Sequence, residues 1–188
     1  MEKFTVLNEF IRVTSKWVTI IGEKCKEKED VPFEYWRVEK DHSLIILPMQ
    51  NNYILLPPPV YRHGVGVMTL DLPGGRVAST NAEGLVNAAC TILNRELCVC
   101  PADVDHIQPL FKSPLLINSS FSNQKLFAFT AVINSSWEAS PETEISRYSL
   151  SVQGLTALLE SMECLQCRSV LLEFFYQKTN SSNQLKEE

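Results

Sequence analysis

The chain has 188 residues, of which 45% are hydrophobic and 21% are charged, and its formal net charge is -5. These proportions are those of a folded domain rather than a disordered chain, and the length suits one domain. The acidic balance and the scattered Lys and Arg residues argue against nucleic-acid binding, which needs a basic face. The apolar runs are far shorter than the ~20 residues that span a bilayer. We therefore expect a cytoplasmic protein with no membrane and no nucleic-acid partner.

Short segments of alternating or continuous apolar residues in the first part of the chain predict strands. They cover residues 17–21, 33–39, 44–47, 53–56 and 67–72. The turn signal Asn51-Asn52 lies between 44–47 and 53–56, so these two segments are predicted to form a hairpin.

The hydrophobic pattern changes its period at residue 82. Apolar residues then recur at three- and four-residue steps, which predicts an amphipathic helix over 82–97. Asn81 or Thr80 can cap this helix, and Glu83 lies in its first turn.

Strands are predicted again at 107–111 and 126–133, and residues 134–144 form a polar, acidic loop. Helices are predicted at 152–162 and 169–175, and the polar tail 179–188 is expected to be disordered. The expected fold class is α/β or α+β, with a mixed β-sheet sandwiched by helices in a single domain over residues 1–178.

Two interpretations of the six cysteines stay open. Cys98 and Cys100 together with Cys164 and Cys167 could form a four-thiolate zinc site, although only the second pair has the usual CxxC spacing. Alternatively, all the cysteines are reduced thiols that pack as small hydrophobic residues.

The segment Asp71-Leu72-Pro73-Gly74-Gly75, followed by Glu83 and by Ala88-Ala89, resembles the signature box of Nudix hydrolases. Tyr61-Arg62 lies upstream of it, and Ser113-Pro114 lies downstream, in an order similar to that of the ADP-ribose pyrophosphatase branch of this family. The resemblance runs from about residue 17 to residue 161. It implies a Nudix fold and the cleavage of a diphosphate linkage with the help of magnesium or manganese.

The family carries three metal-binding carboxylates on the helix of the box. When the chain is aligned on Glu83 and Ala88-Ala89, only Glu96 keeps a carboxylate, while Ile92 and Arg95 occupy the other two positions. One carboxylate beside a guanidinium is a poor site for Mg²⁺, so the box is degenerate and the enzymatic status stays open.

The resemblance nevertheless assigns candidate site residues. It implies Glu96, Gly74 and Glu83 as metal-site residues, with Glu96, Glu142 and Glu144 as catalytic residues. The candidate substrate-binding residues are Arg62, as a phosphate contact, and Tyr61, its neighbour in the Tyr-Arg pair. Trp36 is a third candidate, because its ring could stack on an adenine. For Glu142 and Glu144, the competing interpretation is a solvated acidic loop.

Two functions remain open. One is a Nudix-type hydrolase with weak or lost metal-dependent activity that acts on, or binds, a nucleoside diphosphate derivative such as ADP-ribose. The other is a non-catalytic Nudix-fold module that binds a nucleotide-sugar or a protein partner. Mg²⁺ or Mn²⁺ is the expected cofactor if the protein is active, and none is expected otherwise. The N-terminal segment 1–42 resembles the dimerisation segment of the ADP-ribose branch, so a homodimer is expected.

Overall fold

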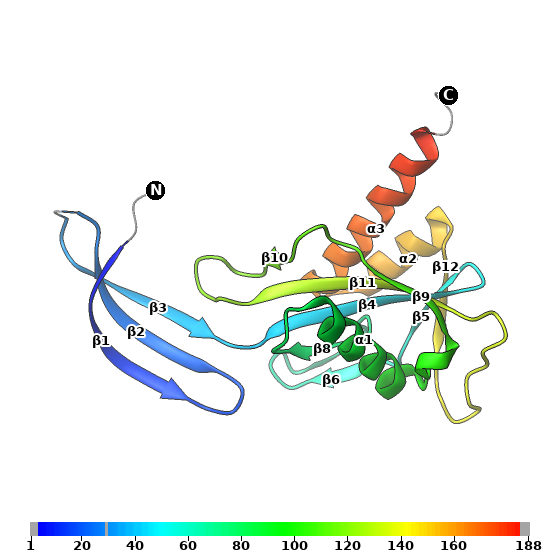
Figure 1. Ribbon diagram of the computed structural model, residues 1–188, viewed down its shortest axis with the longest axis horizontal. Helices are drawn as coiled ribbons and strands as arrows, with labels where there is room; N and C mark the ends of the chain where they lie inside the picture. The colour runs from blue at the N-terminus through cyan, green and yellow to red at the C-terminus, as the bar shows by residue number, and fades with distance from the viewer. Residues whose placement is uncertain (1–3, 29, 185–188) are drawn as a thin grey trace. The chain divides into compact units, whose positions relative to one another are not determined.

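The computed structural model describes the backbone of residues 4–28 and 30–184 and the side chains of these residues as far as residue 180. Figure 1 shows the elements in chain order. The chain divides into two compact units. Unit 1 consists of Met1–His42 and Leu115–Lys125, and unit 2 consists of Ser43–Pro114 and Leu126–Glu188.

Unit 1 is built on an antiparallel three-stranded sheet. Its strands are β1 (Thr5–Thr14), β2 (Thr19–Lys26) and β3 (Phe33–Glu39), in the order β1-β2-β3. The segment that begins with β10 (Leu115–Leu116) returns along β3, where the Val38 N–H donates to the Phe121 carbonyl at 2.7 Å. The sequence predicted β3 with its observed bounds but did not predict β1.

Unit 2 contains a mixed sheet. Its two central strands, β4 (His42–Gln50) and β11 (Lys125–Ile133), are parallel, with Leu44 opposite Phe127 and Ile46 opposite Phe129. The same sheet also contains β5 (Tyr53–Leu56), β8 (Gly74–Val77), β9 (Val104–Pro109) and β12 (Ser146–Ser149). Its β4–β5, β5–β12 and β9–β11 pairs are antiparallel. A separate hairpin is formed by β6 (Val60–Arg62) and β7 (Val67–Thr69).

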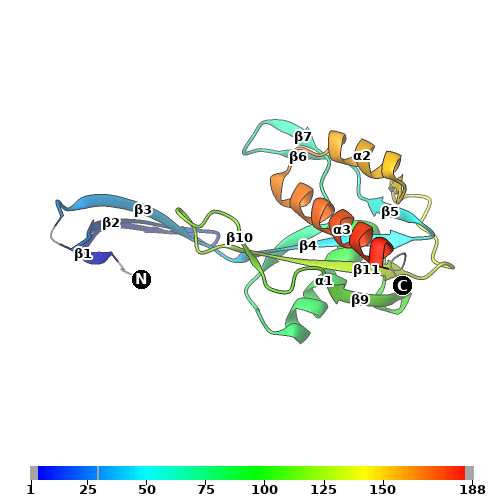
Figure 2. The same ribbon diagram turned by 90° about the horizontal axis from the view of Figure 1, so that it is seen from above.

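Helices cover both faces of this sheet. Figures 1 and 2 show α1 (Ala82–Leu97) on one face, and α2 (Val152–Ser161) and α3 (Leu165–Gln184) on the other. A single turn of 3₁₀ helix, Pro101–Asp103, leads from α1 to β9. The expected fold class, a mixed β-sheet sandwiched by helices, is confirmed.

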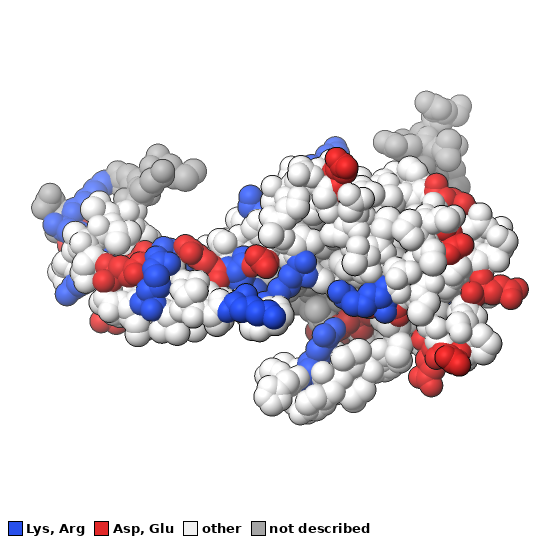
Figure 3. Space-filling model, turned by 60° about the horizontal axis from the view of Figure 1, so that its bottom comes forward, with Lys and Arg blue, Asp and Glu red and all other residues white. Residues whose placement is uncertain are grey.

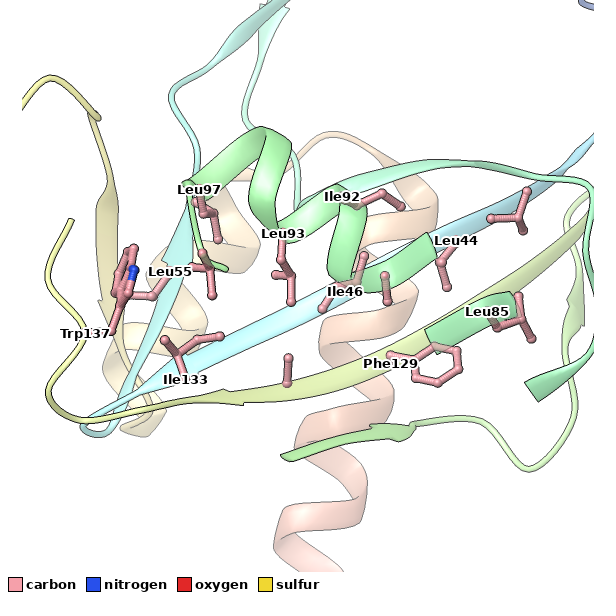
Figure 4. Packing of buried hydrophobic residues seen from close by; sticks show 14 residues of the cluster. Leu44, Ile46, Leu55, Leu85, Ile92, Leu93, Leu97, Phe129, Ile133 and Trp137 are labelled. Carbon is pink, nitrogen blue, oxygen red and sulfur yellow. The ribbon is translucent and has the colours of Figure 1, made fainter. Parts of the chain in front are cut away.

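The main hydrophobic core lies between α1 and the sheet (Figure 4). α1 contributes Leu85, Ile92 and Leu93, which pack in one buried cluster with Leu44 and Ile46 of β4. Ile45 and Leu47, which alternate with these two residues along β4, are also buried but lie outside this cluster. A run of consecutive buried residues is expected when both faces of a sheet are covered.

The ends of α1 follow local rules. The Asn81 side chain caps the first turn by accepting a hydrogen bond from the Gly84 N–H at 2.7 Å, as predicted. At the other end, Cys98 adopts the left-handed conformation with φ of 58°. Glycine is the usual residue at such a position.

The polar tail 179–188 was expected to be disordered, and α3 extends into it as far as Gln184. The helix is tied to the rest of unit 2 shortly before this point. Gln177 donates to the Leu110 carbonyl at 3.0 Å, and Lys178 donates to the Leu150 carbonyl at 3.3 Å. Residues 185–188, the rest of the predicted tail, lie outside the described residues.

The surface carries charges of both signs. On the face drawn in Figure 3, basic side chains are interrupted by acidic ones. Within the described part of the chain, none of the helices has both the length and the apolar composition of a membrane span.

Candidate functional site

A cavity of about 540 Å³ lies in unit 2. Its wall is formed by residues of β4, the β6–β7 hairpin, the segment that leads into β8, and the start of α3. The lining combines apolar side chains such as Val65 and Val67 with charged ones. The charged residues are Arg62, Arg76, Asp71 and Glu163. A concave apolar site with a few polar groups is typical of a small-molecule pocket.

Arg62 and Asp71 form an ion pair in the wall of this cavity. The Arg62 Nε and Nη2 atoms donate to Asp71 Oδ2 at 2.9 and 2.6 Å, and the Thr69 hydroxyl donates to the same oxygen at 3.0 Å. The side chain of Asp71 is only 13% exposed, whereas that of Arg62 is 51% exposed. Both residues also line a second cavity of about 320 Å³, together with Glu96. The ion pair therefore contributes to the walls of two cavities.

The first residue of β8 meets the last turn of α1 through Arg95 and Glu96. The Gly74 N–H donates to Glu96 Oε2 at 3.2 Å. Arg95 Nη2 donates to the Gly74 carbonyl at 2.8 Å and also to Glu96 Oε1. The structure thus brings Glu96 and Gly74 together, as the resemblance implied, with the guanidinium of Arg95 bound to both.

These residues do not fit a divalent magnesium ion. Mg²⁺ requires oxygen ligands in near-octahedral geometry, usually with at least one or two carboxylates. Here the Glu96 carboxylate and the Gly74 carbonyl already accept hydrogen bonds from the guanidinium of Arg95. The guanidinium supplies the positive charge that a metal ion would bring to these two groups.

The structure does not bring Glu83 together with Glu96. α1 is continuous from Ala82 to Leu97, so Glu83 lies in its first turn and Glu96 in its last. At ~1.5 Å per residue, the two positions are separated by about 20 Å along the helix axis. Glu83 is exposed and stabilises the helix through the favourable position of its charge.

Ile92, which the resemblance places at a lost carboxylate, faces the core. It is only 3% exposed and belongs to the main hydrophobic cluster. A Cβ atom on Gly75 would lie 3.0 Å from Ile92 Cδ1, so β8 approaches the helix closely at this point. Glycine at position 75 permits this approach.

The remaining predicted site residues lie elsewhere. Tyr61, on β6, is 56% exposed and is not among the described residues that line either cavity. Glu142 and Glu144 are exposed in the loop after β11 and do not line them either. Trp36 belongs to unit 1, where its ring packs edge-on against Phe10 with the ring centroids 5.4 Å apart. The stacking of Trp36 on an adenine stays a prediction.

Two cysteines at the start of α3 form a cluster with Asp71. One ligand atom each from Asp71, Cys164 and Cys167 lies within 4.8 Å of the others. Cys98 and Cys100 are exposed and do not belong to this group, so the described residues do not form the four-thiolate arrangement. The sequence signal for the cluster was the CxxC spacing at a helix start. Asp71 could not be added to it without the fold.

The two thiols of this cluster interact electrostatically. A hydrogen bond from the Cys167 thiol, with others from the backbone N–H groups of Cys167 and Gln166, lowers the pKa of Cys164 to about 6 despite its partial burial. The same thiol–thiol contact, together with burial, raises the pKa of Cys167. A hydrogen-bonded thiolate at a helix start is a better ligand and nucleophile than an ordinary thiol.

No protein-family model and no curated protein matches this sequence. Among solved structures, the chain is similar to one titled as the crystal structure of an ADP compounds hydrolase. The TM-score is 0.74 and the sequence identity 18%, with 96% of this chain and 97% of that chain covered. The fold is of the Nudix type. At this level of identity, the similarity concerns the arrangement of the backbone.

Proposed function

We propose that the protein binds a nucleoside diphosphate derivative, such as ADP-ribose, in the cavity of unit 2, and that metal-dependent hydrolysis at α1 is weak or absent. The observation that carries the proposal is the position of Arg95, whose guanidinium binds both the Gly74 carbonyl and the Glu96 carboxylate. Gly74 lines this cavity, and the guanidinium that binds its carbonyl cannot activate a water molecule as a metal ion does.

The lining of the cavity supports a phosphate-containing ligand. Arg62 uses Nε and Nη2 for Asp71, and among the described residues its Nη1 atom makes no hydrogen bond. Arg76 adds a second cation to the same wall. Guanidinium groups recognise phosphate oxygens through their planar arrangement of donors. The apolar part of the lining suits the less polar parts of a nucleotide derivative.

The protein of similar fold is named as a hydrolase of ADP compounds. We transfer only the class of ligand to this chain. The loss of activity rests on Ile92 and Arg95, because neither can contribute a carboxylate to a metal site.

The experiment compares binding with turnover. We expect calorimetry to detect binding of ADP-ribose, and chromatography to detect no AMP after long incubation with magnesium or manganese. Arg62→Gln should weaken binding by about 10- to 100-fold, because a charge-assisted hydrogen bond contributes about 1.5–3 kcal/mol. Lys112→Gln, a surface change outside this cavity, is the matched control. AMP release that Glu96→Gln abolishes would contradict the loss of hydrolysis, and the absence of binding would contradict the ligand class.

We also propose that unit 1 forms a homodimer. Every described residue of β1 is exposed, including the large apolar side chains of Val6, Leu7, Phe10 and Val13. A contiguous exposed apolar surface is typical of an interface between proteins. Light scattering should give the mass of a dimer, and the Val6→Asp, Val13→Asp double variant should give the mass of a folded monomer. An unchanged mass in this variant, or a monomeric parent, would contradict the proposal.

A further inference from the structure

The group formed by Cys164, Cys167 and Asp71 has the composition of a soft metal site. Cys164 directly precedes α3, and Cys167 lies in its first turn. Residues three positions apart on a helix lie on the same side, so the two sulfur atoms are neighbours. Asp71 reaches them from the segment between β7 and β8, and the three ligand atoms lie within 4.8 Å of one another.

The two carboxylate oxygens of Asp71 have different surroundings. Oδ2 accepts three hydrogen bonds, two from Arg62 and one from Thr69. Oδ1 is buried and has no hydrogen-bond partner among the described residues. Buried carboxylate oxygens are normally satisfied, because leaving one without a partner costs free energy. Asp71 therefore combines an unsatisfied buried oxygen with a position beside two sulfur atoms, and a bound cation would satisfy both groups.

We propose that Cys164, Cys167 and Asp71 bind a divalent cation of the zinc class, with the cavity supplying its fourth ligand. Thiolates select zinc over magnesium, and zinc tolerates one carboxylate beside two sulfurs. Two sulfurs at ~2.3 Å from a tetrahedral zinc lie about 3.8 Å apart, which the observed grouping allows with little movement. The site differs in residues and in chemistry from the degenerate magnesium site at Glu96.

The surroundings of the group suit this role. Arg62 and Thr69 fix the orientation of Asp71 through Oδ2, in the manner of residues that hold metal ligands in place. All three proposed ligands line the cavity of about 540 Å³, so a water molecule or a ligand oxygen can complete the coordination. Three protein ligands with one open position are typical of zinc sites that take part in binding or catalysis.

A disulfide between Cys164 and Cys167 is the competing interpretation. It would use both sulfurs but would leave Asp71 Oδ1 without a partner. The cation accounts for the sulfurs and the carboxylate together, and we therefore favour it.

The test is a cobalt titration of the full chain under reducing conditions. Cobalt bound to thiolates gives an intense sulfur-to-cobalt charge-transfer band in the near ultraviolet. We expect one cobalt per chain, displaced by an equivalent of zinc. Cys164→Ser should remove most of the band. Asp71→Asn should keep a sulfur band but weaken cobalt binding by at least about tenfold.

The matched control is the Cys98→Ser, Cys100→Ser double variant, because both of these cysteines are exposed and lie outside the group. It should bind cobalt like the parent. Cys164 is only half-buried, so its serine variant is expected to fold, and circular dichroism checks this. If Cys164→Ser does not fold, reaction of Cys164 with iodoacetamide provides the second test, and zinc should protect it at least tenfold.

Three outcomes would overturn the proposal. The first is that the unsubstituted protein gives no sulfur-to-cobalt band under reducing conditions. The second is that this band persists in folded Cys164→Ser. The third is a disulfide between Cys164 and Cys167 that survives reduction. Metal content and cobalt spectra do not depend on ADP-ribose. A failure here is therefore distinct from a failure of the proposed function.

Discussion

Ile92 and Arg95 have different environments, although the family resemblance assigns both to lost carboxylates. Ile92 is 3% exposed in the main core, while the side chain of Arg95 is 56% exposed and binds Gly74 and Glu96. A carboxylate at position 92 would have to be buried among apolar side chains, whereas one at position 95 could remain in contact with water. Introducing a carboxylate should therefore lower the free energy of unfolding more at position 92 than at position 95.

Our first prediction is that Ile92→Glu lowers the free energy of unfolding by about 3 kcal/mol or more, because it buries a charge without a partner. Arg95→Glu should cost only about 1 kcal/mol, since it places a second charge beside Glu96 at an exposed position. Urea denaturation measures both. A similar stability for the two variants, or full rescue of the Ile92→Glu, Arg95→Glu double variant by magnesium, would show that position 92 can turn toward a metal site.

Cys98 provides a second prediction at this scale. It adopts a left-handed conformation with φ of 58°, which strains residues that carry a Cβ atom. Cys98→Gly should raise the free energy of unfolding by about 0.5–1 kcal/mol, because relief of strain exceeds the added entropy of the unfolded chain. Cys98→Ala is the control: it also removes the 3.5 Å contact of Sγ with the Thr143 hydroxyl, but keeps the strain. Equal stability of the two variants would contradict the strain argument.

At the scale of elements, an ion pair joins β2 and β3 across the sheet of unit 1. Arg37 donates to both carboxylate oxygens of Glu23 at 2.9 Å, and the side chain of Glu23 is only 10% exposed. The hydrogen bonds from Arg37 lower the pKa of Glu23 below its ordinary value of 4.5. Glu23 therefore binds protons less readily in the folded state than in the unfolded state.

The third prediction follows from the sign of this shift. The pair contributes its full stability above about pH 4.5, and the contribution is lost as the pH falls through the lower folded-state pKa. Glu23→Gln should cost about 1 kcal/mol at pH 7 and progressively less in acid, because the parent then loses the same interaction. Denaturation at a series of pH values checks this. A cost that is independent of pH would contradict the role of the charge.

Local patterns predicted some elements better than others. The bounds of α1 follow from its apolar period and from Asn81, so 82–97 was predicted with the observed ends. β1 has no buried face, and its mixture of polar and apolar residues did not resemble a strand. α3 extends beyond the predicted 169–175 at both ends, because contacts such as that of Gln177 with Leu110 hold polar turns that lack a helical pattern.

At the scale of the whole molecule, the sequence predicted the fold better than the site. The family resemblance assigned Gly74 and Glu96 to one site, and the structure brings these two residues together. The cluster of Asp71 with Cys164 and Cys167 depends on α3 returning to the loop before β8. No local pattern encodes such a contact. One alternative from the sequence grouped Cys164 and Cys167 with Cys98 and Cys100, which are exposed and lie outside the cluster.

Arg95 links Gly74 to Glu96 through hydrogen bonds from a cation that is itself part of the chain. A guanidinium remains attached to its own backbone, whereas a magnesium ion exchanges with the solvent and is present only in proportion to its free concentration. The conformation around Gly74 should therefore not depend on the concentration of free magnesium. As a fourth prediction, millimolar magnesium chloride should leave the melting temperature where sodium chloride of equal ionic strength leaves it. A specific rise in the parent would contradict this, and Arg95→Glu is the variant in which such a rise is expected.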